Sequence, residues 1–219
     1  MAPCPVLANK EGASRGGRLP QESATSVAFG GPDVCILGEF RVNGVDGTIW
    51  RRSPKRARLL GLLLMNVNRT VSSADLARLV WPHTLPASPG PRRVATAIYR
   101  LRSIISAAGV TTIDIETVGA GYRAVGDPDS IDLHARLKML KHRRLNRDPG
   151  DLADLIDEAA SLFPEQILKD LVTEEMRPFV TDGLFALLDD TFGGHIHESA
   201  IDHIADRALG RISADAAAV

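Results

Sequence analysis

Three apolar stripes with helical spacing follow one another in the middle of the chain. Their apolar residues recur every three or four positions, as on one face of an α-helix. Ser53 and Pro54 suit the start of the first helix, and Ser72 or Ser73 suits the start of the second. The third helix is predicted over residues 91–108. The stripes are Ala57, Leu60, Leu64 and Val67, then Leu76, Leu79 and Val80, then Val94, Ile98, Leu101 and Ile105.

Short runs with strand character lie on both sides of this helical stretch. They are Asp33–Leu37, Glu39–Asn43 and Thr48–Arg51 before it, and Ile113–Val118 and Tyr122–Val125 after it. Glycines between consecutive runs supply turns, so we expect a small antiparallel sheet first and a β-hairpin last. Strands, three helices and a terminal hairpin in this order are typical of a winged helix. The sequence therefore predicts an α+β winged helix over residues 33–127.

The rest of the chain divides into three further parts. Residues 1–32 are rich in Gly, Pro, Ala and Ser and lack a hydrophobic period, which predicts a disordered leader. Residues 128–212 have helical periodicity and predict an all-α, helical-repeat-like domain, and residues 213–219 a disordered tail. The helices of the second domain are expected at about Leu133–Arg144, Asp151–Phe163, Glu174–Thr191 and His197–Ile212.

Charge is distributed unevenly, although the whole chain is almost neutral with 26 Lys and Arg against 27 Asp and Glu. Residues 51–108 contain 11 Lys and Arg against one acidic residue, a net charge of +10. Residues 145–219 contain five Lys and Arg against 16 Asp and Glu, a net charge of −11. This asymmetry indicates a module that binds a polyanion, joined to an acidic interaction module.

Other classes of protein fit the sequence poorly. The two cysteines, Cys4 and Cys35, do not suggest a disulfide framework, and no apolar run approaches the ~20 residues of a membrane span. We expect a cytoplasmic protein that does not bind a membrane. His195, His197 and His203 match no compact metal motif, and no nucleophile–base pair or phosphate loop stands out. The chain is therefore expected to have no cofactor and not to be an enzyme.

Exposed basic residues of the third helix are the main candidates for binding duplex DNA. An α-helix fits the major groove, and arginine pairs with guanine there. A second basic cluster precedes and begins the first helix, where backbone N–H groups and cations suit phosphates. The alternative for the arginines of the third helix is a solvated helix face without a ligand. The predicted DNA contacts are Arg92, Arg93, Thr96, Ala97, Tyr99, Arg100 and Arg102 in the third helix, Arg51, Arg52, Lys55 and Arg56 in the second cluster, and Arg123 in the hairpin.

Several motifs in the same order resemble a known family. The runs RRVATAIYRLRSII and IETVGAGYRA resemble the recognition helix and wing of the OmpR/PhoB-type winged helix. Upstream, ILGEFRVNG and SPKRARLLGLLLMNVNRTVSSADLARLVW are similar to the version in antibiotic regulatory proteins of the SARP type. SIDLHARLKML resembles the opening of the bacterial transcriptional activator domain that follows it there. The sequence departs from the family at Val118, where arginine is frequent, and at Ala97, which offers only a methyl group.

The resemblance implies a sequence-specific, double-stranded DNA-binding transcriptional regulator of the activator kind, associated with the nucleoid. Its implied partners are RNA polymerase or other transcription machinery, and a second copy as a homodimer or a pair on direct repeats. The activator domain is expected to be shortened, and control by a phosphorelay is not expected because no receiver-like segment precedes the winged helix. The alternative is a non-activating adaptor that binds DNA weakly and acts on proteins through its helical half.

Overall fold

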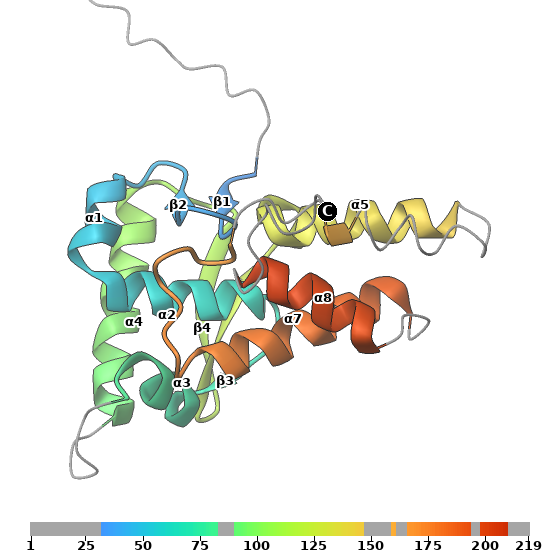
Figure 1. Cartoon of the computed structure of the whole chain (residues 1–219). Helices are drawn as coiled ribbons and strands as arrows, with labels where there is room; N and C mark the ends of the chain where they lie inside the picture. Colours follow the sequence, from blue (N-terminus) through green and yellow to red (C-terminus); the bar gives the residue numbers. More distant parts are fainter. Residues whose placement is uncertain (1–31, 83–89, 147–158, 161–165, 194–197, 210–219) are drawn as a thin grey trace, which may run out of the picture. The chain divides into compact units, whose positions relative to one another are not determined.

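The computed structural model describes residues 32–82, 90–146, 159–160, 166–193 and 198–209 (Figure 1). Within them it is a mixed α/β fold with two small antiparallel sheets. The predicted leader and the predicted helix Asp151–Phe163 fall almost wholly outside these residues, and the predicted tail falls entirely outside them. The chain from residue 32 onward forms one compact unit. The predicted division at residues 127/128 therefore stays a prediction.

Two of the three strands expected at the start are present, and the third is a helix. Strand β1 (Val34–Cys35) pairs antiparallel with β2 (Arg41–Val42). The expected strand Thr48–Arg51 is wrong, because Gly47–Arg52 forms helix α1. The Asp46 carboxylate caps this helix by accepting from the Thr48 backbone N–H at 2.9 Å. Trp50 is buried edge-to-face against Phe40, with 5.2 Å between the ring centroids. This cap and this packing outweigh the strand propensity of the run.

Three longer helices form the centre of the fold, as the apolar stripes predict. They are α2 (Pro54–Met65), α3 (Ser73–Val80) and α4 (Gly90–Ala107), and the residues of all three predicted stripes are buried. Pro54 occupies the first turn of α2, and Ser72 caps α3 by accepting from the Asp75 backbone N–H at 3.0 Å. Helix α4 is packed against α3 and α2.

The hairpin after α4 forms as predicted, and a short strand adds to it. Strands β4 (Ile113–Val118) and β5 (Gly121–Gly126) pair antiparallel, with Val118 opposite Gly121 beside the turn. Strand β3 (Val71–Ser72) pairs with the other edge of β5, although Ser72 was expected only at a helix start. A Cβ atom on Gly121 would lie 2.4 Å from the Val71 carbonyl oxygen. Glycine is therefore needed where β3 meets the hairpin.

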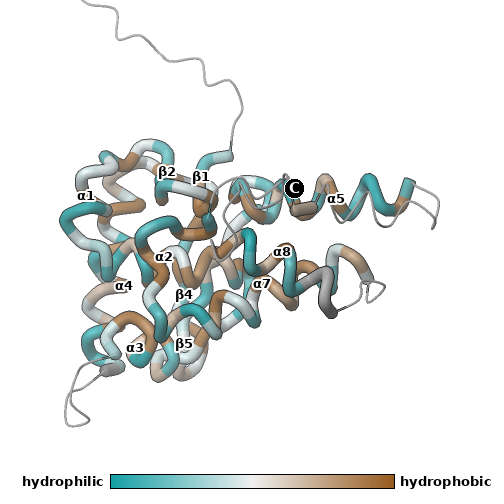
Figure 2. The backbone as a smooth tube through the Cα atoms, in the orientation of Figure 1, coloured by the Kyte–Doolittle hydropathy of each residue, from teal (hydrophilic) through white to brown (hydrophobic). Residues whose placement is uncertain are grey.

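Helices α5 (Asp132–Leu145), α7 (Arg177–Phe192) and α8 (Glu198–Ala208) follow the hairpin after a short 3₁₀ turn, η1 (Pro128–Ser130). Helix α5 packs against α7, and α7 packs against α8 and α2. Figure 2 shows hydrophilic and hydrophobic positions alternating along α5. These helices agree with the predicted periodicity. The structure does not establish a helical repeat.

A turn-forming segment of the helical half, residues 166–172, packs against the winged helix. The Gly38 N–H donates to the Gln166 carbonyl at 2.8 Å, and the Leu168 N–H donates to the Ile36 carbonyl at 2.6 Å. On α2, the Arg58 Nε donates to the Leu171 carbonyl at 2.7 Å. The two halves are therefore held together by backbone pairing as well as by helix packing.

Candidate nucleic-acid interface

The start of α2 and the exposed side of α4 border one groove of about 690 Å³. Eight of the twelve predicted contact residues line it, and its lining contains six basic residues and no acidic one. A surface with this charge attracts a polyanion. The lining residues are Arg52, Ser53, Pro54, Lys55, Arg56, Trp81, Arg92, Arg93, Thr96, Ala97 and Arg100.

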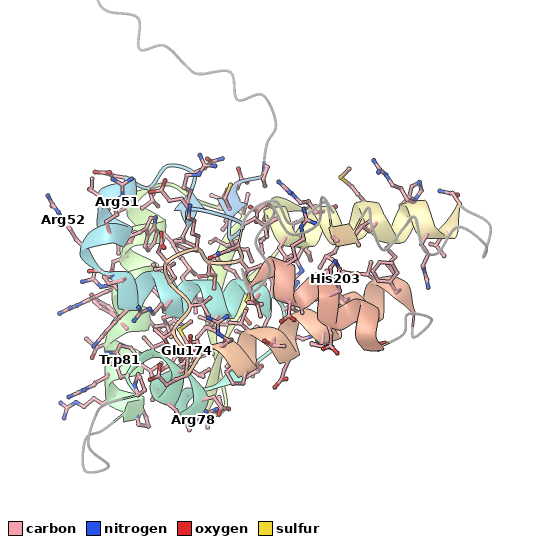
Figure 3. The ribbon with its side chains drawn as sticks, in the orientation of Figure 1. Arg51, Arg52, Arg78, Trp81, Glu174 and His203 are labelled. Atoms are coloured by element: carbon pink, nitrogen blue, oxygen red, sulfur yellow. The ribbon has the colours of Figure 1, made fainter. Side chains whose placement is uncertain are left out.

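The first turn of α2 forms one wall of this groove. Ser53 stands at the N-cap without a capping hydrogen bond from its side chain, and the first turn contains no acidic residue. The partial positive charge at the helix N-terminus is therefore not neutralised locally. Lys55 is exposed and Arg56 is half-buried beside it, and Arg52 points outward from α1 (Figure 3). This wall is suited to phosphate oxygens.

The exposed side of α4 forms the other wall. Val94, Ile98 and Leu101 are buried, so the opposite side of the helix faces solvent. Arg92, Arg93, Thr96 and Arg100 are exposed there. The Thr96 hydroxyl donates to the Arg92 carbonyl at 3.0 Å, which leaves its oxygen free to act only as an acceptor.

Tyr99 and Ala97 have contrasting positions on α4. Tyr99 is 71% exposed and projects from the helix outside the groove lining. Ala97 is only 8% exposed, although it contributes to the groove wall. Its methyl group is thus recessed, whereas the Tyr99 ring and hydroxyl are accessible to a ligand on this face.

Arg51 lies next to the groove but already has an acidic partner. Its Nη2 is 2.7 Å from the Glu39 carboxylate, and both side chains are exposed. The hydrogen bond to Arg51 lowers the pKa of the Glu39 carboxyl from its usual value. An exposed pair of this kind contributes little to stability. Its main effect is to offset part of the positive charge of Arg51.

Two further predicted contacts, Arg102 and Arg123, are bound to the hairpin. Arg123 forms an ion pair with Glu116, which lies directly opposite it on β4, at 2.7 Å. The Arg102 Nε donates to the Ile115 carbonyl at 2.7 Å. Neither arginine lines the groove.

Trp81 belongs to the groove although it was not among the predicted contact residues. Its side chain is half-buried at the end of α3 and contributes to the lining (Figure 3). The sequence run LVWP does not tell whether its tryptophan lies in the core or in a groove wall. The packing of α3 against α4 determines its position.

In the part of the chain that the structure describes, no three His, Cys, Asp or Glu side chains are grouped as metal ligands would be. His203 is exposed on α8 (Figure 3), and His195 and His197 lie outside the described residues. None of the described helices is both long and apolar enough to cross a membrane.

Comparison with known proteins identifies the winged helix. Residues 47–124 match the family model described as "Transcriptional regulatory protein, C terminal". The chain therefore contains a DNA-binding winged-helix domain of the OmpR/PhoB type. This match confirms the resemblance that the motifs of α4 and the hairpin indicate.

Two curated transcriptional regulatory proteins are similar to this chain over about half of its length. The "Transcriptional regulatory protein MoaR1" of Mycobacterium tuberculosis (strain ATCC 25618 / H37Rv) is 31% identical over 121 residues. The protein of the same description from Mycobacterium bovis (strain BCG / Pasteur 1173P2) gives the same identity and coverage. The aligned region is 54% of this chain and 37% of each relative. The chain thus matches less than half the length of these relatives.

A solved structure also aligns with the chain. It is described as "Mycobacterium tuberculosis EmbR in complex with low affinity phosphopeptide", with a TM-score of 0.48 and 22% sequence identity. The alignment covers 75% of this chain and 43% of that one.

Proposed function

We propose that this chain is a transcriptional regulator that binds double-stranded DNA in a sequence-specific way and inserts α4 into the major groove. The observation that carries the proposal is the groove in which α4 and the start of α2 present six basic side chains and no acidic one. A helix with an exposed basic side fits the major groove, and cations beside it fit the flanking phosphates.

The groove residues and the neighbouring Tyr99 divide into two roles in this proposal. Arg93, Arg100 and Tyr99 project from α4 and contact base edges, arginine being suited to guanine O6 and N7. Arg52, Lys55 and Arg56 hold phosphates beside the major groove and contribute affinity without sequence preference. Arg92, Thr96 and the recessed Ala97 also line the groove. Arg123 and Arg51 contribute at most a phosphate contact each, because both already pair with a carboxylate.

The helical half, residues 128–212, is proposed to act as a shortened activator domain with a helical-repeat-like arrangement. Its acidic composition and its apolar helix faces support binding to other proteins of the transcription machinery, RNA polymerase included. A weak homodimer, or a pair assembled on direct repeats, follows from the same proposal. The regulator would act in the cytoplasm on the nucleoid.

Selection of bound sequences from random duplex DNA tests the proposal, followed by affinity measurements across a salt series. We expect one enriched motif and a steep fall of affinity with salt, because phosphate neutralisation releases counterions. Arg100→Ala should lose about 1–3 kcal/mol on the enriched site and much less on random DNA. Lys55→Ala should weaken all sequences alike and reduce the salt slope by about 0.9.

Lys169→Ala is the matched control, because it removes the same charge from an exposed position outside the groove. It should change neither affinity nor salt slope. Salt-dependent binding without an enriched motif would favour the adaptor that binds DNA weakly. Absence of binding at low salt would refute the proposal.

A further inference from the structure

Arg102 connects α4 to the hairpin through two hydrogen bonds. Its Nε donates to the Ile115 carbonyl at 2.7 Å, and its Nη2 donates to the Thr117 hydroxyl oxygen at 3.0 Å. Its side chain is half-buried, whereas Arg92 and Arg100 on the same helix are exposed. The guanidinium of Arg102 is thus occupied within the protein.

The Ile115 carbonyl needs such a partner because β4 is an edge strand. The sheet order is β3-β5-β4, so β4 has a neighbour on one side only. The backbone N–H of Ile115 donates to the Asp114 carboxylate at 2.7 Å instead of to β5. Both backbone groups of Ile115 therefore face away from β5, as they do at alternate residues of an antiparallel strand. Arg102 satisfies the exposed carbonyl with an ionised donor, which forms a strong hydrogen bond.

The positions of the two acceptors suit arginine. Ile115 and Thr117 are two residues apart on β4, and one guanidinium reaches both the Ile115 carbonyl and the Thr117 hydroxyl. The planar guanidinium holds Nε and Nη2 in a fixed fork that reaches both at once. A lysine ammonium is a single point at the end of a flexible chain and cannot reproduce this arrangement.

The position of the contact on the hairpin gives it a mechanical role. Thr117 lies opposite Tyr122, one pair before the Val118–Gly121 pair that closes the turn. Helix α4 packs against β4, and Ile105 and Ile115 are both buried in the core. The bond from Arg102 to Thr117 adds a second point of attachment, close to the turn of the hairpin. With two points of attachment, the direction of the hairpin relative to α4 is fixed.

We propose that Arg102 is a positioning residue that holds the wing at a fixed angle to the recognition helix. The inference rests on the proposed function, and it assigns Arg102 a role other than the direct DNA contact expected from the sequence. With α4 in the major groove, the angle of the hairpin decides where the wing meets the neighbouring DNA backbone. A wing that is already positioned loses less conformational entropy on binding.

The exchange of Arg102 for lysine separates this role from a phosphate contact. Lysine keeps the positive charge, so a contact with phosphate would survive the change. It cannot form both hydrogen bonds to β4, so the attachment of the hairpin to α4, here called the brace, would be lost. In the DNA-free protein, we expect Arg102→Lys to speed hydrogen exchange of the Asp114 and Glu116 amides, which face β5. Arg78→Lys is the matched control, because Arg78 is exposed and pairs with Asp75 on α3. It should leave this exchange unchanged.

DNA affinity provides the second measurement, in a cycle of Arg102→Lys, Thr117→Val and the double variant on the enriched site. We expect Arg102→Lys to lower affinity about fivefold to tenfold with an unchanged salt slope, as for the loss of a charge-assisted hydrogen bond. The effect of Thr117→Val should be smaller and should vanish in the Arg102→Lys background, because the two side chains act through one contact.

Three results would overturn the inference. Unchanged exchange in Arg102→Lys would show that no brace exists. Full affinity in Arg102→Lys, or additive effects in the cycle, would show that Arg102 does not act through Thr117. A wild-type protein that binds no DNA would instead refute the proposed function, and the exchange measurement would still test the brace itself.

Discussion

Replacement of Gly61 by alanine tests how closely the helical half is docked on α2. Gly61 is buried in α2, and a Cβ atom there would lie 2.5 Å and 2.9 Å from the two methyl carbons of Leu168. Leu168 is fully buried, and its φ of 49° is already in the left-handed region. The side chain therefore has little room in which to move away, and Gly61→Ala should push residues 166–172 away from α2.

The magnitude follows from two opposing effects. Alanine in place of glycine within a helix gains about 1 kcal/mol of helix propensity. An extra methyl group in a packed core costs about 1–3 kcal/mol. We expect Gly61→Ala to be neutral or to destabilise by up to about 2 kcal/mol. Leu168→Ala should cost about 2–5 kcal/mol, because it leaves a cavity. In the double variant the new methyl group occupies part of that cavity, so the double variant should be more stable than Leu168→Ala alone.

Urea unfolding of the four proteins measures this cycle. Gly183→Ala on α7 is the control, because a Cβ atom there meets only the Met65 methyl carbon at an ordinary 3.7 Å. It should stabilise the protein by up to about 1 kcal/mol. If Gly61→Ala stabilised the protein as much as Gly183→Ala, with no coupling to Leu168→Ala, the docking of residues 166–172 on α2 would be refuted.

Two further predictions concern the buried ionisable groups of α5. The Asp132 carboxylate accepts from the buried backbone N–H groups of Ile36 and Leu37 at 2.9 and 3.1 Å. Asp132→Ala should therefore destabilise the protein by about 2–5 kcal/mol. An unchanged midpoint of urea unfolding would contradict this prediction. His134 lies 2.9 Å from the Leu64 carbonyl, and burial lowers the pKa of its ring from 6.5. Stability should therefore fall as pH drops from 6.5 towards that lowered pKa, since the unfolded chain then binds a proton that the folded chain does not. His134→Gln should reduce this slope in thermal melts between about pH 5 and 7.5, and an identical slope would exclude His134 as its source.

The helices were predictable because their signal is local. The stripes of α2, α3 and α4 needed only the 3.6-residue period and the capping residues Ser53, Pro54 and Ser72. Helix α1 was missed because Thr48, Ile49 and Trp50 have strand propensity. The Asp46 cap is visible in the sequence, but the packing of Trp50 on Phe40 is decided by tertiary structure.

The sheet was predictable only where its strands are long. The hairpin of β4 and β5 has two alternating runs and a glycine turn, and these predicted its two strands. Strand β3 is two residues long, which is too short for any period to appear. It becomes a strand because β5, about 50 residues later, supplies its hydrogen-bonding partner. No local pattern indicates such a pairing.

The sequence predicted which basic residues belong to the candidate site. It did not predict which of them are already bound to other groups of the protein. The sequence shows where Arg51, Arg102 and Arg123 lie along the chain, but not the groups that they contact. Their partners come from β4 or from the turn before β2, at separations that only the folded backbone sets. A charge count therefore overestimates the basic side chains that are available to a polyanion.

Arg58 shows how this affects the relation between the two halves. It belongs to the basic cluster that begins α2, yet its Nε donates to the Leu171 carbonyl and holds residues 166–172 against the helix. The first two turns of α2 therefore contact two different parts of the protein. Lys55 and Arg56 line the groove. Arg58 and Gly61 contact the helical half. Because close-packed interiors transmit strain, a displacement of residues 166–172 would be felt by α2 and by the groove wall that α2 forms. The helical half is thus connected to the proposed DNA-binding surface through α2 itself.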